Sequence, residues 1–398
     1  MVAGSPGSSI DPVRLQLRYA PGEARARFRG IVKVGGGVRV PRFSAIWLAT
    51  ALLFAVSPLL SSGSVSRSGL LSILPFAAIL AIAATGQTLV VQQRGLDLSV
   101  PGMITLTTII VTQFSHGSDN RLWGAAGLIV LACAVSGLVS GIAITWLGVT
   151  PLVATLGVNA LLTGVVLQIT SGATTAQAPP GLARFALGKS GGIPNTVIVA
   201  AIAVVAVALV IRMSVLGRRF IAVGASPAAA RAAGVRVKAV EIGTYVGASL
   251  AYGGAGVLLA GYVGTPGINT GNDYLLPTIA AVVLGGTSLA GGNGSVVATA
   301  VGAVFLTQLD QVVVAMGAPT SVQYVIQGSI IALGMAIRNV PWRRFTHFVP
   351  RSFKQSLKPS GGVDDPAPTE ERRRAFARRG GSGSVPTAIG VEEVDDDQ

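Results

Sequence analysis

Long apolar runs separated by short polar segments cover most of the chain from residue 43 to residue 337. A helix needs about 20 mostly apolar residues to cross a bilayer, and about ten runs come near that length. Short or weak apolar content in the third, fifth and eighth runs predicts broken or tilted helices there. The pattern predicts an all-α fold, a polytopic transmembrane helical bundle of about ten spans. The ten runs are Ser44–Leu60, Leu70–Val91, Ser99–Phe114, Leu122–Leu147, Pro151–Ile169, Pro194–Ile211, Val240–Val263, Pro277–Leu289, Ser295–Met316 and Ser321–Ile337.

The basic residues are spread unevenly, and this predicts the orientation of the chain. Lys and Arg concentrate in the cytoplasmic loops of membrane proteins. Ten crossings place both termini on one side of the membrane. If that side is the cytoplasm, all but four of the 30 basic residues lie inside, and both termini are predicted to be cytoplasmic. The four outer ones are Arg67, Arg121, Arg184 and Lys189.

Composition supports a membrane domain flanked by polar, charged segments. Only 12% of the residues are charged and 51% are hydrophobic, with a mean hydropathy of +0.65, whereas soluble domains carry about twice that charged share. We expect a basic cytoplasmic segment over 1–43, a transmembrane domain over 44–338, and a disordered, charged cytoplasmic tail over 339–398. The net charge of +14 is concentrated in the tails and inner loops, so it does not indicate a nucleic-acid partner.

The chain lacks the residues that most enzymes and ion-coupled transporters need. Cys133 is the single cysteine and the two histidines stand apart, so the sequence predicts no metal site, no cofactor and no enzymatic activity. Asp310 is the one charge well inside a predicted span, and it either lines a pathway or reaches water. A channel or secondary transporter remains an alternative, although proton coupling usually needs a row of titratable residues. The segment Gly181–Ser190 only approximates a phosphate-binding loop, because six residues instead of four precede its Gly-Lys pair. Energy for active transport would therefore come from another chain.

The longest inner connection spans residues 212–239 and contains a predicted short helix. Ser226 suits the N-cap, Pro227 suits the first helical position, and Gly234 suits the position just past the end. Such a helix, bordered by arginines, is either a docking element for a partner subunit or a helix lying at the lipid boundary.

Four segments in order resemble one family of transport proteins. They are GQTLVVQQRGLDLSVPGMITL (86–106), TPLVATLGVNALLTGVVLQITSG (150–172), GRRFIAVGASPAAARAAGVRV (217–237) and IAAVVLGGTSLAGGNGSVVATAVGA (279–303). Together they resemble the ribose-type sugar permeases of ABC transporters, a group allied to the branched-chain amino acid permeases. The chain departs from the family where Arg94 replaces a usual Gly, where Pro101 follows Val100, and where Leu275 and Pro277 replace frequent acidic residues.

The resemblance implies a membrane-spanning permease subunit of an ABC importer in the cytoplasmic membrane. A monosaccharide is the favoured solute, with branched-chain amino acids or nucleosides as alternatives. The implied partners are a second permease copy, a cytoplasmic ABC ATPase and an extracellular solute-binding protein. The ATPase would dock on the coupling loop at Gly224, Pro227, Ala230, Arg231 and Gly234.

Polar residues within the spans are the candidates for the translocation pathway: Gln87, Thr88, Asp97, Asn159, Thr163 and Asp310. Asp97 and Ser99 are also expected to cap the third span. Asn159 and Thr163, one turn apart, either contact the solute or bond neighbouring helices. A further set is expected to permit a tight turn and close helix approach, namely Gly285, Gly286, Gly291, Gly292 and Gly294.

Overall fold

The computed structural model describes residues 31–33, 39–41, 43–61 and 63–339, with side chains for 43–61 and 63–333. Each of the ten predicted runs contains a helix, so the all-α polytopic fold is confirmed. Predictions for residues 1–30 and for the tail from residue 340 lie outside the described residues. The helices of the ten runs are α2 (Ser44–Leu60), α3 (Arg67–Gln92), α4 (Val100–Gln113), α5 (Leu122–Thr145), α6 (Pro151–Thr170), α8 (Asn195–Met213), α11 (Val237–Val263), α12 (Leu275–Leu284), α13 (Val296–Ala315) and α14 (Thr320–Asn339).

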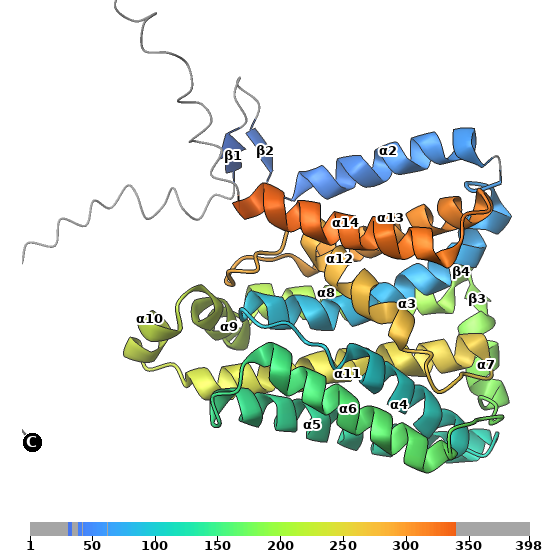
Figure 1. The fold of residues 1–398 in the computed structure, drawn as a ribbon, viewed down its shortest axis with the longest axis horizontal. Helices are drawn as coiled ribbons and strands as arrows, with labels where there is room; N and C mark the ends of the chain where they lie inside the picture. The colour runs from blue at the N-terminus through green and yellow to red at the C-terminus, as the bar shows by residue number, and fades with distance from the viewer. Residues whose placement is uncertain (1–30, 34–38, 42, 62, 340–398) are drawn as a thin grey trace, which may run out of the picture. The chain divides into compact units, whose positions relative to one another are not determined.

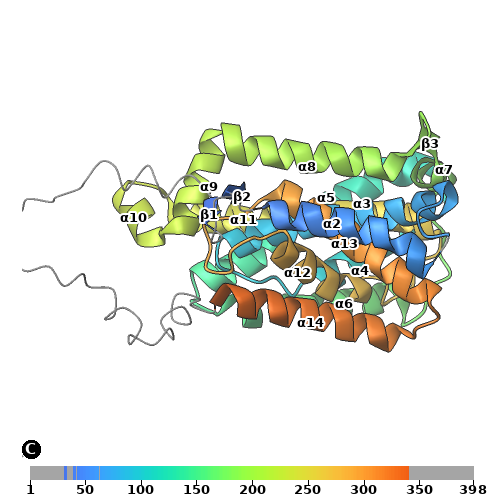
Figure 2. The ribbon, with the colours of Figure 1, turned by 90° about the horizontal axis from the view of Figure 1, so that it is seen from above.

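The helices run back and forth between two ends of a bundle. Figures 1 and 2 show α9 (Val215–Ala225) and α10 (Pro227–Ala232) at one end, and α7 (Pro180–Leu187) at the other. The start of α2 and the end of α14 lie at the α10 end (Figure 1). This arrangement gives an even number of passes between the start of α2 and the end of α14, and it places the middle loop at the end where both lie.

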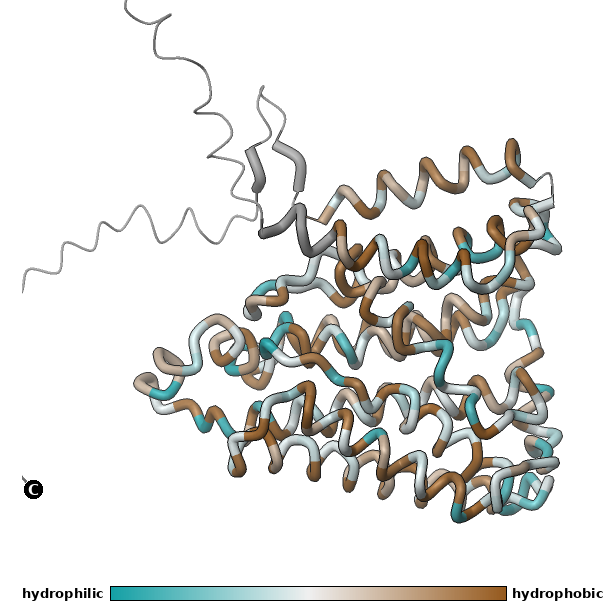
Figure 3. The backbone as a smooth tube through the Cα atoms, in the orientation of Figure 1, coloured by the Kyte–Doolittle hydropathy of each residue, from teal (hydrophilic) through white to brown (hydrophobic). Residues whose placement is uncertain are grey.

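Charge separates the two ends among the residues with described side chains. Seven basic residues lie at the α10 end and four at the α7 end. Figure 3 shows hydrophobic residues along the helices and many of the hydrophilic ones at the ends. The seven are Arg94, Arg212, Arg218, Arg219, Arg231, Arg236 and Lys238, and the four are Arg67, Arg121, Arg184 and Lys189.

Two helices of the bundle are too short to cross a membrane. At 1.5 Å per residue, the 14 residues of α4 and the 10 residues of α12 extend roughly 21 Å and 15 Å, against a hydrocarbon core of about 30 Å. Non-helical segments, residues 93–99 before α4 and 285–295 after α12, complete these two passes. The expectation of broken helices is confirmed for the third and eighth runs. The fifth run is not broken, because α6 is continuous over 20 residues.

Six helices among the described residues are long and apolar enough to span a membrane, and α3 lies at the centre of their packing. Gly86 of α3 faces α11 so closely that an added Cβ would lie 2.8 Å from the Ala248 carbonyl oxygen. Gly137 of α5 likewise meets the backbone of α11, 2.7 Å from the Tyr245 carbonyl oxygen. Small residues permit such contacts in lipid, where no hydrophobic force drives helices together.

Several short elements were not predicted. α9 precedes the predicted short helix, and residues 31–33 and 39–41 pair as strands β1 (Ile31–Lys33) and β2 (Arg39–Pro41). At the α7 end, β3 (Lys189–Ser190) pairs with β4 (Ile193–Pro194). The segment that approximates a phosphate-binding loop forms α7 and β3, where Asp119 accepts a 2.7 Å hydrogen bond from the Gly181 N–H.

Candidate functional site

The short helix of the middle loop forms where the sequence predicts it. Ser226 is the N-cap, and its hydroxyl accepts a hydrogen bond from the Ala229 N–H at 3.3 Å. Pro227 takes the first helical position, and Gly234 follows the helix in the left-handed conformation at φ +77°. These features confirm the helix itself.

One face of α10 is buried and the opposite face is free. Ala230 is 3% exposed and packs with Val223 of α9 and Val237 of α11. Arg231, the next residue, is exposed. The buried contact holds α10 to the bundle through α9, and the exposed residues offer a basic surface at the α10 end.

Three distant segments meet beneath α9, and we call this contact the three-segment junction: residues 92–94, residues 220–225 and residues 291–294. Arg94 donates from Nε to the Gly224 carbonyl oxygen at 3.2 Å and from Nη2 to the Ala225 carbonyl oxygen at 2.6 Å. Gln93 donates from Nε2 to the Phe220 carbonyl oxygen at 2.8 Å. Arg94 therefore satisfies two of the last carbonyl groups of α9, which have no partner within the helix, and Gln93 adds a bond one turn earlier.

The glycine loop after α12 closes the junction from the other side. The Gly292 N–H donates to the Gln92 carbonyl oxygen at 2.9 Å. Gly291 and Gly292 have φ of +84° and +74°, a conformation that other residues adopt only with strain. An added Cβ on Gly292 would also lie 2.9 Å from the Ala225 Cα, so the backbone there has no room for a side chain.

The other glycines of this loop also make close contacts. An added Cβ would lie 2.7 Å from the Thr299 backbone at Gly285 and 2.6 Å from the Gln92 side chain at Gly294. Gly286 has φ +79°. Together these positions shape the loop between α12 and α13, which contains a turn closed by the Gly291 N–H on the Ser288 carbonyl oxygen at 3.0 Å and packs against the end of α3.

The segment before α4 is organised by Asp97, which is 1% exposed. Its Oδ1 accepts hydrogen bonds from the Ser99 N–H at 2.9 Å and the Ser99 hydroxyl at 2.6 Å. The prediction that Ser99 and Asp97 cap α4 is wrong, because the Ser99 hydroxyl is engaged by the carboxylate and caps no helical N–H. Asn159 of α6 supplies the cap instead, with Oδ1 accepting from the Gly102 N–H at 2.8 Å.

A second buried polar group links α3 to the helices around it. Gln87 Oε1 accepts a hydrogen bond from the Tyr252 hydroxyl at 2.9 Å, and Asp97 interacts with the same tyrosine. Thr88 donates to the Thr299 hydroxyl at 2.9 Å and so joins α3 to α13. All five of these residues are buried inside one copy of the chain.

The two remaining pathway candidates lie elsewhere. Thr163 is exposed on α6, and its hydroxyl donates to the Asn159 carbonyl oxygen at 2.9 Å. Asp310 of α13 accepts hydrogen bonds from Gln327 of α14 at 3.2 and 3.3 Å. Thus the fold brings Gln87 and Asp97 together at Tyr252, places Asn159 and Thr163 on α6, and keeps Asp310 apart. Within the described part of the chain no three His, Cys, Asp or Glu side chains cluster as a metal site would require.

A family model described as "Branched-chain amino acid transport system / permease component" matches residues 69–335. This chain belongs to that permease family. The matched region starts within α3 and ends within α14, so it includes the three-segment junction, the middle loop and both broken passes.

Two curated relatives show which permeases this chain is similar to. The chain is 30% identical over 308 residues to the ribose import permease protein RbsC of Escherichia coli strain K12, covering 75% of this chain and 96% of that protein. It is 29% identical over 339 residues to the autoinducer 2 import system permease protein LsrC of Yersinia pseudotuberculosis, covering 83% and 96%. The predicted resemblance to ribose-type permeases is confirmed. No solved structure matches this chain.

The structure of the permease shows where each departure from the family pattern lies and what it contacts. Arg94 stands at φ +69°, which explains why a glycine suits that position, and its side chain makes the two bonds to α9. Pro101 is the second residue of α4, where a missing N–H leaves no helical bond unmade. Leu275 begins α12 and Pro277 lies in its first turn. The sequence analysis did not single out Gln92, Gln93 or Arg94 as site residues, because their partners are 127 or more residues away.

Proposed function

We propose that this permease forms the membrane pathway of an ABC importer in the cytoplasmic membrane, and that a separate cytoplasmic ATPase drives it. A solute-binding protein outside the cell would deliver a small, hydroxyl-rich solute, with a monosaccharide favoured. Support for the solute class comes from the relatives, which are named for ribose import and autoinducer 2 import. Branched-chain amino acids or nucleosides are the alternatives within transport.

The observation that carries the proposal is the three-segment junction. α9 and α10 lie at the basic end of the bundle, where the positive-inside rule predicts the cytoplasm. The junction connects them directly to the two non-helical segments, residues 93–99 and 285–295. A displacement of α10 by a bound ATPase would therefore reach α4 and α12, the two helices that end inside the bundle. Coupling between sites needs such a contiguous chain of contacts with two arrangements.

A second permease copy would cover the exposed face of α6. Gly157, Ala160 and Gly164 recur at intervals of three and four residues on this face, and an added Cβ on either glycine would meet nothing within 4 Å. Thr163, just before Gly164, and Gln168, four residues after it, are exposed as well. Small and polar residues of this kind favour helix–helix contact in lipid. Thr163 would then lie at the interface between the two copies, which is where a residue lining a shared translocation pathway is expected.

Alternative mechanisms predict other features. A proton-coupled transporter usually places ionisable residues in its spans, and in the described helices of the ten runs only Glu241 and Asp310 are acidic, with Asp97 in the non-helical segment before α4. Glu241 interacts with Arg231, Arg94 and Lys238 at the α10 end, so it belongs to the coupling region. These features support a pathway that obtains its energy from another subunit.

The proposal is tested by pull-down and by uptake in vesicles. The variants Arg231→Glu and Ala230→Pro should lose the cognate ATPase in a pull-down while the permease still inserts into the membrane. Arg218→Glu is a matched control, because it makes the same charge change on α9 outside the predicted docking residues. Unaltered capture of the ATPase by both test variants would refute the docking site. Uphill uptake by the permease alone, without an ATPase, would refute the whole mechanism.

A further inference from the structure

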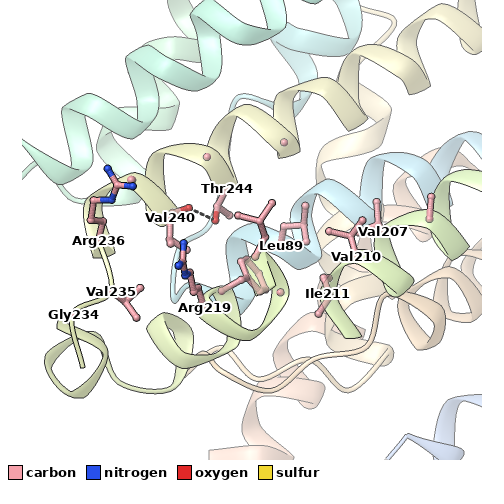
Figure 4. Close-up of a pocket in the computed structure, with 17 residues that line it drawn as sticks. Leu89, Val207, Val210, Ile211, Arg219, Gly234, Val235, Arg236, Val240 and Thr244 are labelled. Atoms are coloured by element: carbon pink, nitrogen blue, oxygen red, sulfur yellow. Dashed lines mark hydrogen bonds between the residues drawn. The ribbon is translucent and has the colours of Figure 1, made fainter. Parts of the chain in front are cut away.

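A cavity of about 880 Å³ lies between α8, α9 and α11 at the α10 end of the bundle. Its walls come from four helices and the loop before α11, and they are largely apolar. Figure 4 shows Val207, Val210 and Ile211 along α8, with Leu89 of α3 beside them. The cavity shares Phe220 with the three-segment junction and Gly234 with the predicted docking residues, but it contains none of the pathway candidates.

Two arginines stand at one end of this cavity. Figure 4 shows Arg219 of α9 and Arg236 near Gly234, at the end away from the α8 side chains. Both arginines are exposed, and neither makes a salt bridge or a side-chain hydrogen bond with another described residue. None of the described residues that line the cavity is acidic. Glu241 of α11 interacts with Arg231, Arg94 and Lys238 instead.

We propose that this cavity binds one anionic phospholipid from the cytoplasmic leaflet of the membrane. Its phosphate would sit between Arg219 and Arg236, and an acyl chain would lie along Val207, Val210 and Ile211 of α8. The polarity of the cavity matches the polarity of a lipid, because charge lies at the end of the bundle and apolar surface extends toward its middle. Basic pockets between helices on the cytoplasmic side bind anionic head groups in this way.

Location also favours a lipid over a soluble anion. The cavity is formed by α8, a spanning helix whose side chains Ile202, Val205 and Leu209 are exposed, as expected at a lipid boundary. A free phosphate would use the arginines but leave the apolar walls in contact with water. A lipid covers both surfaces and connects α8, α9 and α11, so it would stabilise the position of α9.

The test is native mass spectrometry of the full-length permease with phosphatidylglycerol and phosphatidylcholine of identical acyl chains. The permease should retain one phosphatidylglycerol in preference to phosphatidylcholine. The double variant Arg219→Ala/Arg236→Ala should bind phosphatidylglycerol about 30-fold more weakly and lose the preference, since each arginine near the head group contributes about fivefold. The matched control is Arg212→Ala/Arg218→Ala, which removes the same charge from α8 and α9 outside the cavity.

A second pair of variants tests the apolar part of the cavity. Gly243 of α11 lines it with open space beyond its Cα, so Gly243→Leu should fill the acyl-chain site and reduce retention of both lipids. Gly254→Leu adds the same side chain to α11 outside the cavity and should bind lipid like the natural chain. Three results would overturn the proposal: equal lipid loss in the arginine control, displacement of phosphatidylglycerol by millimolar inorganic phosphate, or no selective retention by the natural chain.

Discussion

Arg94 Nη2 lies 2.6 Å from the carbonyl oxygen of Ala225, 131 residues further along the chain. The contact joins the end of a central membrane helix to the last residue of α9, which precedes α10, the helix with the predicted docking surface. The Arg94 backbone adopts φ +69°, which costs a non-glycine residue about 1 kcal/mol. The conformation is maintained because the side chain makes two hydrogen bonds that a glycine cannot make.

Replacing Arg94 separates its backbone effect from its side-chain effect. Arg94→Ala loses both hydrogen bonds and keeps the backbone strain, whereas Arg94→Gly loses the bonds and relieves the strain. We expect Arg94→Gly to be more stable than Arg94→Ala by about 1 kcal/mol. Cys133 is buried, so its reaction with a thiol dye on heating reports unfolding.

Both Arg94 variants should also weaken the coupling between solute transport by the permease and ATP hydrolysis by the ATPase. Solute-stimulated ATP hydrolysis by the reconstituted complex should fall by about tenfold, given that the lost bonds are partly exposed and contribute about 1–2 kcal/mol together. Pull-down of the ATPase should remain, because the exposed surface of α10 is unchanged. Wild-type stimulation in both variants would show that the junction does not transmit movement.

Gly224 tests the packing of the junction. An added Cβ at this position would lie 2.4 Å from the Gln92 carbonyl oxygen, which is backbone and has little freedom to move. Gly224→Ala should therefore destabilise the permease by about 1–3 kcal/mol in thermal unfolding. Gly127→Ala on α5 is the control, because nothing lies within 4 Å of its added Cβ. Equal unfolding temperatures for the two variants would contradict the close contact.

Asp97 tests the segment before α4. Asn at this position keeps an oxygen for the two hydrogen bonds from Ser99, whereas Ala leaves both buried donors without a partner. Since the carboxyl is buried and its Oδ2 has no hydrogen-bond partner among the described residues, loss of charge costs little there. Asp97→Asn should be at least as stable as the natural chain, and Asp97→Ala less stable by about 1–3 kcal/mol. A large loss of stability in the Asn variant would show that the charge itself is needed.

Orientation is tested by labelling single cysteines in a Cys133→Ala background. Ser190 in β3 and Ala228 in α10 are both exposed and lie at opposite ends of the bundle. A membrane-impermeant thiol reagent added to intact cells should label Ser190→Cys at once and Ala228→Cys only after permeabilisation. The reverse order would invert the topology and place the coupling loop outside.

Apolar runs alone predicted the ten helices well, because a backbone in lipid must satisfy its hydrogen bonds within each segment. Local signals likewise predicted α10 through Ser226, Pro227 and Gly234. α9 was missed because its 11 residues mix arginines with apolar side chains and are too short to form a span. For the ten helices and for α10, the interactions that determine the helix join residues only a few positions apart in the chain.

The contacts that organise the candidate site are non-local, and the sequence did not reveal them. Ser99 has the residue type of an N-cap, yet Asp97 engages its hydroxyl and Asn159 caps α4 from another helix. The glycines after α12 indicated a tight turn, but not that Gly292 would bond to Gln92. Only the folded chain shows that the departure at Arg94 makes a bond that the family's usual glycine lacks.

The three-segment junction also constrains how the chain is made. Its parts come from the first quarter, the middle and the last third of the polypeptide, so no partial chain emerging from the ribosome contains all of them until residue 294 has been synthesised. The Gln92 carbonyl oxygen has no Gly292 N–H to accept from before that point, whereas the partners of Arg94, Gly224 and Ala225, are made about 70 residues earlier. Insertion of the spans and completion of the fold are therefore separate events in the biogenesis of this protein, with the second waiting for α12 and the glycines that follow it.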